Sequence, residues 1–171
     1  RIFEKEGVDT SGISTGVSAT AGSVIVSSLE RSTRAINTRQ PMNQAPVNAA
    51  AKKLVSEAAW IHVDHVGVNR LAEFAVSRGQ GPLISFDAGY GVETFDPIVV
   101  DLFVPTDRQM ALRYPGVNLA VALENDSMKA GNTVVATQGS AGSAGFSPET
   151  GLVTAPGYKV DVVSTLGAGD V

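Results

Sequence analysis

The residues with the clearest chemical potential stand at 164–171, which read Ser-Thr-Leu-Gly-Ala-Gly-Asp-Val. Gly167, Ala168 and Gly169 allow a backbone to approach a ligand closely, since their side chains are small or absent. If a helix begins near Gly169, its free N–H groups and positive dipole end would bind an anion such as a phosphoryl group. Asp170 beside that position could accept a proton from a substrate hydroxyl. The simpler interpretation is a glycine turn with an aspartate cap, and composition alone favours it.

A second glycine turn stands upstream of this one. Residues 134–142 read Val-Val-Ala-Thr-Gln-Gly-Ser-Ala-Gly, and they place Thr137, Gly139 and Gly142 where a predicted strand ends. Ligands of open α/β sheets bind outside the carboxyl ends of the parallel strands. Two glycine turns that follow successive strand segments could therefore cradle one nucleotide, although each turn alone is a weak signal.

Two histidines and an aspartate form another polar cluster, within Trp-Ile-His-Val-Asp-His at 60–65. Successive side chains of a strand point to opposite faces, so His62 and His65 face opposite sides and a shared metal is not expected. His62 and Asp64 share a face and could contact a ligand at the end of the strand. The simpler interpretation, which we favour, is a polar strand end satisfied by loop backbone, with Trp60 in the core. We assign no metal-ligating residues.

The composition limits the classes of protein to which the chain can belong. It has 171 residues, 43% of them hydrophobic and 18% charged, which suits one globular domain with its own core. The net charge of −4 and the lack of a basic block argue against a nucleic-acid partner. No apolar run approaches the roughly 20 residues that cross a bilayer, and no signal peptide is visible. The absence of cysteine excludes disulfides and suits a cytoplasmic protein.

Alternating strands and helices would position the candidate residues. A β-branched run at 22–28 could pair with residues 32–37 as two strands. Beyond them the pattern predicts, in order, a helix at 46–58 capped by Asn48 or Asn43, a strand at 60–66, a helix at 67–79 that Gly79 ends, strands at 82–87 and 97–105, helices at 106–114 and 118–131, a strand at 132–139, and a hairpin near 143–147 and 151–155. This alternation predicts a mainly parallel sheet with helices on both faces, and the first two strands form a separate flap.

Together these segments resemble the ribokinase-like (PfkB) carbohydrate kinases. The motif at 164–171 is similar to the second signature of that family, which is quite specific. The segments at 7–14, 22–26, 60–66, 83–90 and 102–116 fall in the family's usual order, so the resemblance spans about residues 7–171. It implies an α/β, ribokinase-like three-layer sandwich with a mainly parallel central sheet and a small β lid, lacking its N- and C-terminal parts. The whole of 1–171 would be one partial domain, with about residues 15–40 in the lid.

The resemblance also implies an activity, which is ATP-dependent phosphorylation of a hydroxyl of a sugar or sugar derivative, with Mg²⁺. Within the family the chain is most similar to the fructose, sulfofructose and ribose kinases. The implied catalytic residues are the base Asp170 and the anion hole of Gly167, Ala168 and Gly169. The implied nucleotide-binding residues are Thr137, Gly139, Gly142 and Thr165. Arg31 or Arg34 in the lid could approach the substrate, although a solvated turn is the simpler interpretation.

Several positions depart from the family pattern. Ser164 stands where the family often has Asp, and Asp87 lacks the Asn and Arg that often follow it, so Asp87 could be only a strand-end residue. Thr106 and Gln109 occupy the positions of an Asn-x-x-Glu motif that helps to organise magnesium and phosphate. Neither side chain can give a negative charge to a metal shell. This puts the usual magnesium arrangement in doubt, although water-mediated contacts could survive.

Two alternative functions stay open at this point. One is a non-catalytic relative that binds a sugar or nucleotide, and the other is a nucleoside kinase. The expected partner is a small-molecule sugar, with no nucleic acid and no membrane. The resemblance also allows a homodimer formed through the lid, which the sequence does not decide. The chain begins with Arg and reads as an internal portion of a longer protein.

Overall fold

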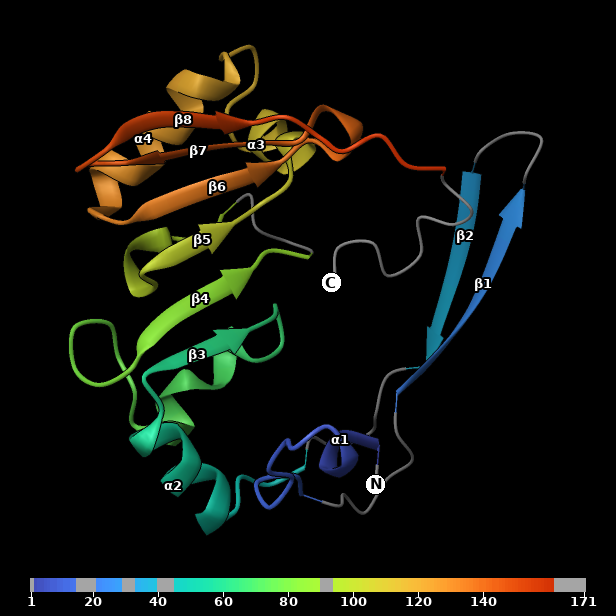
Figure 1. Cartoon of the computed structure of the whole chain (residues 1–171), viewed down its shortest axis with the longest axis vertical. Coiled ribbons are helices and arrows are strands. Elements are labelled where there is room, and N and C mark those ends of the chain that lie inside the picture. Colours follow the sequence, from blue (N-terminus) through green and yellow to red (C-terminus); the bar gives the residue numbers. More distant parts are fainter. Residues whose placement is uncertain (1, 15–20, 29–32, 40–44, 90–93, 162–171) are drawn as a thin grey trace. The chain divides into compact units, whose positions relative to one another are not determined.

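A computed structural model describes residues 2–14, 21–28, 33–39, 45–89 and 94–161 of the chain. Its contacts divide the chain into two compact units, Arg1–Glu57 and Ala58–Val171. The strands and α-helices of both units are labelled in Figure 1. Among the residues described, no helix combines the length and apolar composition that crossing a membrane requires.

The first unit contains a two-stranded sheet. Its elements are α1 (Ile2–Lys5), β1 (Gly22–Ser28), β2 (Thr33–Arg39) and α2 (Ala49–Glu57). β1 and β2 pair antiparallel with Ile25 opposite Ile36, which confirms the predicted strand pair. The side chain of Asn48 accepts a hydrogen bond of 2.7 Å from the N–H of Ala51, so it caps α2 as predicted.

The second unit contains a six-stranded sheet in the order β3-β4-β5-β6-β7-β8. Its elements are β3 (Trp60–Val63), η1 (Val68–Phe74), β4 (Leu83–Asp87), η2 (Pro97–Val99), β5 (Leu102–Val104), α3 (Asp107–Arg113), α4 (Leu119–Ala130), β6 (Thr133–Thr137), η3 (Gly139–Ala141), β7 (Ser143–Ser147) and β8 (Gly151–Ala155). β3 to β6 are parallel, while β7 and β8 pair antiparallel at the positions predicted for the hairpin. The sheet is therefore mainly parallel, as the alternating pattern predicted.

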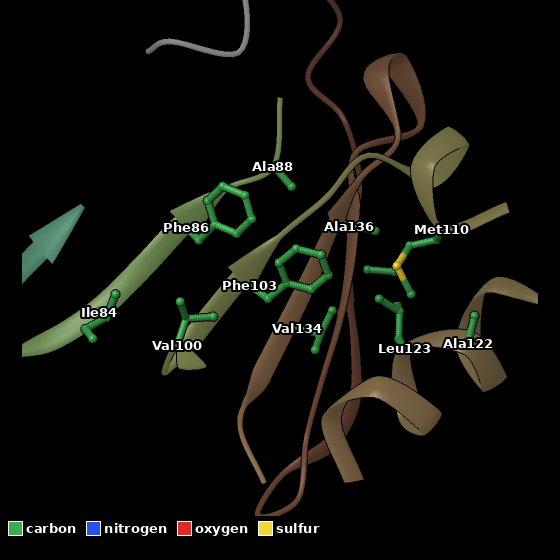
Figure 2. Close-up of a cluster of buried hydrophobic side chains, with 11 residues drawn as sticks. Ile84, Phe86, Ala88, Val100, Phe103, Met110, Ala122, Leu123, Val134 and Ala136 are labelled. Atoms are coloured by element: carbon green, nitrogen blue, oxygen red, sulfur yellow. The ribbon is translucent and has the colours of Figure 1, made fainter. Parts of the chain in front are cut away.

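The hydrophobic core lies against one face of this sheet. Alternate residues of the central strands, Ile84 and Phe86 on β4, Phe103 on β5 and Val134 on β6, are buried together with Met110 of α3 and Leu123 of α4. Figure 2 shows Met110 and Leu123 of the helices near Val134, with Phe103, Phe86 and Ile84 further along the sheet. Each fully buried side chain of this size contributes roughly 1.5–3 kcal/mol, so this layer is the main stabilising contact of the unit.

The helical cover within residues 58–161 lies on this core face. Side chains of η1, α3 and α4 all pack in or against the one core cluster, which places these helices on the same face of the sheet. On the opposite face Trp60 is 47% exposed and its neighbour Leu83 is 46% exposed. The sequence pattern predicted helices on both faces, and the described residues of this unit supply one of those two layers.

Several predicted elements are shorter than expected, among them the strand predicted at 60–66, which ends at Val63. The helix predicted at 67–79 is a 3₁₀ helix that ends at Phe74, because Ala75 adopts a left-handed conformation with φ of 54°. The strand predicted at 97–105 begins only at Leu102. Asp96 accepts a hydrogen bond from the N–H of Ile98, and Pro97 opens the short helix η2 in place of the first part of that strand.

A polar network joins the amino ends of the parallel strands. One carboxylate oxygen of Asp101 accepts from Arg78 Nε at 3.0 Å, and the other accepts from the N–H of Ile84 at 2.8 Å. Arg78 also donates to the carbonyl oxygens of Ala130 and Gly131, which end α4. A cation at a helix C-terminus is favourable because the carbonyl groups there carry the negative end of the helix dipole.

Candidate functional site

The carboxyl ends of β3, β4, β5 and β6 meet at one edge of the sheet, because these four strands are parallel. Backbone hydrogen bonds extend the pairing beyond the strands. Ala88 donates to Val104 at 3.0 Å, and Thr137 donates to Pro105 at 3.0 Å. The strand exits therefore form a continuous edge, and this is where ligands bind in open α/β sheets.

A tight turn follows β6 at this edge, as predicted. The N–H of Gln138 donates to Gly142 at 2.8 Å, which closes the turn, and the Thr137 side chain at its start is exposed. Gly139 and Gly142 have φ of 55° and 98°, in the left-handed region that favours glycine. The structure thus brings Thr137, Gly139 and Gly142 together at the predicted place.

A packing contact gives Gly142 a second reason to be glycine. A Cβ atom on Gly142 would stand 2.0 Å from the carbonyl oxygen of Ala155, and one on Gly157 would stand 2.3 Å from that of Ser140. The turn after β6 and the segment after β8 therefore cross at backbone contact. The sequence analysis missed this pair, and the glycine that follows β8 was the only available signal.

The glycine–aspartate motif lies outside the described residues. This applies to Asp170, Gly167, Ala168, Gly169 and Thr165, and also to Ser164. Arg31 likewise lies outside them, and the side chain of Arg34 is not described. Their assigned roles stay predictions.

Thr106 and Gln109 begin helix α3 directly after β5. The Thr106 hydroxyl accepts from the N–H of Gln109 at 3.2 Å, and Gln109 Oε1 accepts from the N–H of Thr106 at 2.6 Å, which is a reciprocal capping box. Gln109 Nε2 also donates to the carbonyl oxygens of Ala88 and Gly89, and its distance to the Gly89 oxygen is 3.0 Å. Both side chains are thus engaged by backbone groups.

At the end of β3, Asp64 is held by loop backbone, as the favoured interpretation predicted, whereas the partner of His62 is a side chain of β4. Asp64 Oδ1 accepts from the N–H groups of Val66 and Gly67 at 3.0 and 2.7 Å and so holds the turn before η1. His62 Nδ1 lies 2.8 Å from Ser85 Oγ, and Trp60 Nε1 donates to the same hydroxyl at 2.8 Å. The prediction that Trp60 is a core residue is wrong for the described structure, because Trp60 is on the face opposite the core.

No metal centre is evident in the described part of the chain. Across residues 2–14, 21–28, 33–39, 45–89 and 94–161, no three His, Asp or Glu side chains converge in a way that could hold an ion. Two pockets of ≈ 330 and ≈ 440 Å³ lie elsewhere in the second unit, and neither is lined by a predicted site residue. The edge formed by the strand exits is the candidate site because Thr137, Gly139 and Gly142 lie there.

The shifted pKa values of Arg113 and Tyr114 belong to a structural contact between α3 and α4. Asp126 is fully buried, and it pairs with Arg113 at 2.7 Å and accepts from the Tyr114 hydroxyl at 2.6 Å. Burial raises the pKa of Tyr114 above its ordinary value, and the hydrogen bond to Asp126 raises this pKa further. These groups fasten the two helices together and take no part in the strand-exit edge.

Comparison of structures, rather than of sequences, identifies the known proteins that are similar to this chain. No model of a protein family matches the sequence, and a search of curated proteins found no match. A protein from E. coli described as a ribokinase II, with ATP and Mg²⁺, matches 98% of this chain with a TM-score of 0.74 and 18% sequence identity. Ribokinase from Cryptococcus neoformans with ADP matches 99% with a TM-score of 0.70 and 15% identity. Arabidopsis thaliana ribokinase with ribose and ATP matches 90% with a TM-score of 0.68 and 19% identity.

The fold is ribokinase-like. The chain spans 60%, 61% and 54% of the lengths of these three structures, so it has a partial ribokinase-like fold. The predicted fold class is confirmed, because a mainly parallel central sheet and a separate small antiparallel sheet are both present. At 15–19% identity the likeness concerns the ribokinase-like fold itself.

Proposed function

We propose that the chain is part of a carbohydrate kinase, which transfers the γ-phosphate of ATP to a hydroxyl of a sugar or sugar derivative. The observation that carries the proposal is the strand-exit edge within a ribokinase-like fold, where β6 ends in Thr137 and the glycine turn at 139–142. Similar structures are described with ATP, ADP or ribose bound, which supports the choice of substrates. The antiparallel sheet of β1 and β2 would act as the lid over the sugar.

In the proposed reaction one glycine turn binds the nucleotide and the other stabilises the phosphoryl group in transfer. Thr137, Gly139 and Gly142 would hold the nucleotide, with Thr165 nearby. Asp170 would accept the proton of the acceptor hydroxyl as its oxygen bonds to the γ-phosphorus and the bond to ADP breaks. The N–H groups at Gly167, Ala168 and Gly169 would stabilise the charge of the phosphoryl group in transfer.

Magnesium would accompany ATP and neutralise its phosphates when bound. The residues described at the strand-exit edge do not form a fitting set of ligands, since Thr106 and Gln109 are neutral and engaged with backbone groups. We therefore assign no step to the ion. The same observation favours a second candidate function, a protein that binds a sugar or nucleotide without turning it over.

The test is ADP release by the intact protein with ATP, Mg²⁺ and a panel of ketoses, aldoses, sugar acids and nucleosides. Release with a sugar supports the proposal, release with nucleosides alone assigns a nucleoside kinase, and ATP binding without release supports the non-catalytic candidate.

Asp170→Ala tests the proposed base. It should lower kcat by about a thousandfold or more, because general-base catalysis and positioning are both lost, while ATP affinity stays within about threefold. Asp161→Ala, at an exposed carboxylate in the segment after β8, is the matched control and should keep wild-type turnover. Wild-type turnover by Asp170→Ala would overturn the assignment.

A further inference from the structure

Gln109 forms hydrogen bonds to the exits of two strands, β4 and β5. It is the third residue of α3, and its amide bonds to backbone groups of three residues: Thr106 after β5, and Ala88 and Gly89 after β4. We infer that Gln109 is a positioning residue of the candidate site, which locks the exits of β4 and β5 together and so fixes the loops around the bound substrates. The catalytic part of this inference rests on the proposed kinase function.

The contacts show that the amide does more than cap the helix. A capping box needs only an acceptor at this position, and Glu serves as well as Gln. Here Nε2 donates to two carbonyl oxygens that lie about twenty residues earlier in the chain. Carbonyl oxygens cannot donate and the N–H of Thr106 cannot accept, so the orientation of the amide is fixed. A carboxylate at 109 would place an oxygen against the carbonyl oxygens of Ala88 and Gly89.

The groups that Gln109 holds are themselves fixed to the neighbouring strands. Ala88 is 1% exposed and donates to Val104, while Thr106 forms a parallel bridge with Thr137. The chain of contacts thus runs from the β4 exit through Gln109 to the β5 exit and on to Thr137 at the β6 exit. Release of Gln109 would free the β4 exit to move relative to the predicted nucleotide turn.

The expected consequence is a loss of turnover rather than of substrate binding. A small displacement of the groups around a reacting centre lowers the rate of the chemical step by one or two orders of magnitude, because the reacting atoms are no longer aligned. The position also brings no negative charge to a cation, and Nε2 and Oε1 are both bonded to the protein. The role of Gln109 is therefore geometric.

The experiment compares Gln109→Met and Gln109→Glu with Asn118→Ala in the intact protein. Asn118 caps α4 by accepting from the N–H of Ala120. Its substitution is a suitable control because Asn118→Ala removes one helix cap and leaves the contacts of Ala88 and Gly89 in place. The first readout is hydrogen exchange at the Thr106 and Ala88 amides. Gln109→Met should speed exchange at Thr106 at least about tenfold because its acceptor is lost, and Asn118→Ala should leave both amides unchanged.

The second readout is steady-state kinetics with the acceptor found in the panel above. Both Gln109 variants should lower kcat about ten- to a hundredfold with KM within about threefold, and Asn118→Ala should match the wild type. Wild-type kcat in both variants, with an active wild-type enzyme, would overturn the positioning role. If the wild-type protein itself releases no ADP, the kinase proposal fails, and hydrogen exchange alone decides the contact: unchanged protection at Thr106 and Ala88 in Gln109→Met overturns it.

Discussion

The two ends of the parallel strands are both rich in polar groups, but they use them differently. At the amino ends, charged side chains are directed at backbone groups: Asp101 joins Arg78 to Ile84, and Arg78 joins Asp101 to the end of α4. At the carboxyl ends, backbone groups tie the strand exits together, and the exposed side chain of Thr137 stands at the turn. The comparison separates an edge that stabilises the fold from the edge that we propose as the ligand site.

The largest expected change in the free energy of unfolding is at the amino ends of the parallel strands. Asp101→Ala should lower the free energy of unfolding by about 3 kcal/mol, because the Arg78 guanidinium and the Ile84 N–H lose a partly buried partner. Urea unfolding of the intact protein measures it. The control is Glu73→Ala, which breaks the more exposed pair between Arg70 and Glu73 and should cost under about 1 kcal/mol. Equal losses would contradict the structural role of Asp101.

The next largest loss of stability is expected from a substitution in the glycine turn at the carboxyl ends of the strands. Gly142→Ala should cost about 2–3 kcal/mol, since the added carbon would stand 2.0 Å from the Ala155 carbonyl oxygen and the two segments must separate. Gly139→Ala is the matched control: φ is 55° but nothing lies within 4 Å, so only about 1 kcal/mol of backbone strain is expected. Thermal unfolding compares them, and a smaller loss for Gly142→Ala would refute the crossing contact.

A smaller effect comes from the contact between α3 and α4. Tyr114→Phe should cost about 1 kcal/mol near neutral pH, because Asp126 keeps its pairing with Arg113. Burial and the hydrogen bond to Asp126 raise the pKa of Tyr114 in the folded state above its ordinary 10.0.

The sign of the pH dependence follows from this shift. A raised folded pKa adds stability that is fully present below about pH 10 and is lost as pH rises through the folded value. The difference in unfolding free energy between wild type and Tyr114→Phe should therefore shrink above about pH 10. A difference that grows with pH would show that the phenol is not held in its protonated form.

The smallest expected effect on stability is at Thr137. Thr137→Ala should change the free energy of unfolding by less than about 0.5 kcal/mol, because the side chain is exposed. It should nevertheless weaken ATP binding about three- to tenfold if the hydroxyl contacts the nucleotide, as calorimetry would measure. Thr154→Ala, at an exposed position of β8, should leave ATP binding unchanged. Equal affinities in all three proteins would remove Thr137 from the proposed site.

The sequence was sufficient for the elements that local chemistry defines. α4 begins with the cap of Asn118 and ends at Gly131 with φ of 62°, and both signals are visible in the sequence. The hairpin of β7 and β8 likewise follows from two short runs and a turn. The helix η1 was predicted too long because nothing in the sequence marks Ala75 for a left-handed conformation.

The contacts of the candidate site could be predicted only in part. Parallel strands fixed the edge at which Thr137 and the glycine turn lie, because strand exits share one side of a sheet. The bonds from Gln109 to Ala88 and Gly89, and the crossing of Gly142 with the segment at Gly157, join residues far apart in the sequence. Such contacts depend on how the strands are packed, and no local sequence pattern predicts them.

The hydrogen bond from Trp60 to Ser85 gives the protein a built-in optical probe. Trp60 is the single tryptophan of the chain, and its indole is half exposed while its N–H is held by the neighbouring strand. Fluorescence emission from this one ring therefore reports whether β3 remains paired with β4, without any label. Separation of the two strands would give the N–H to water and shift the emission to longer wavelength.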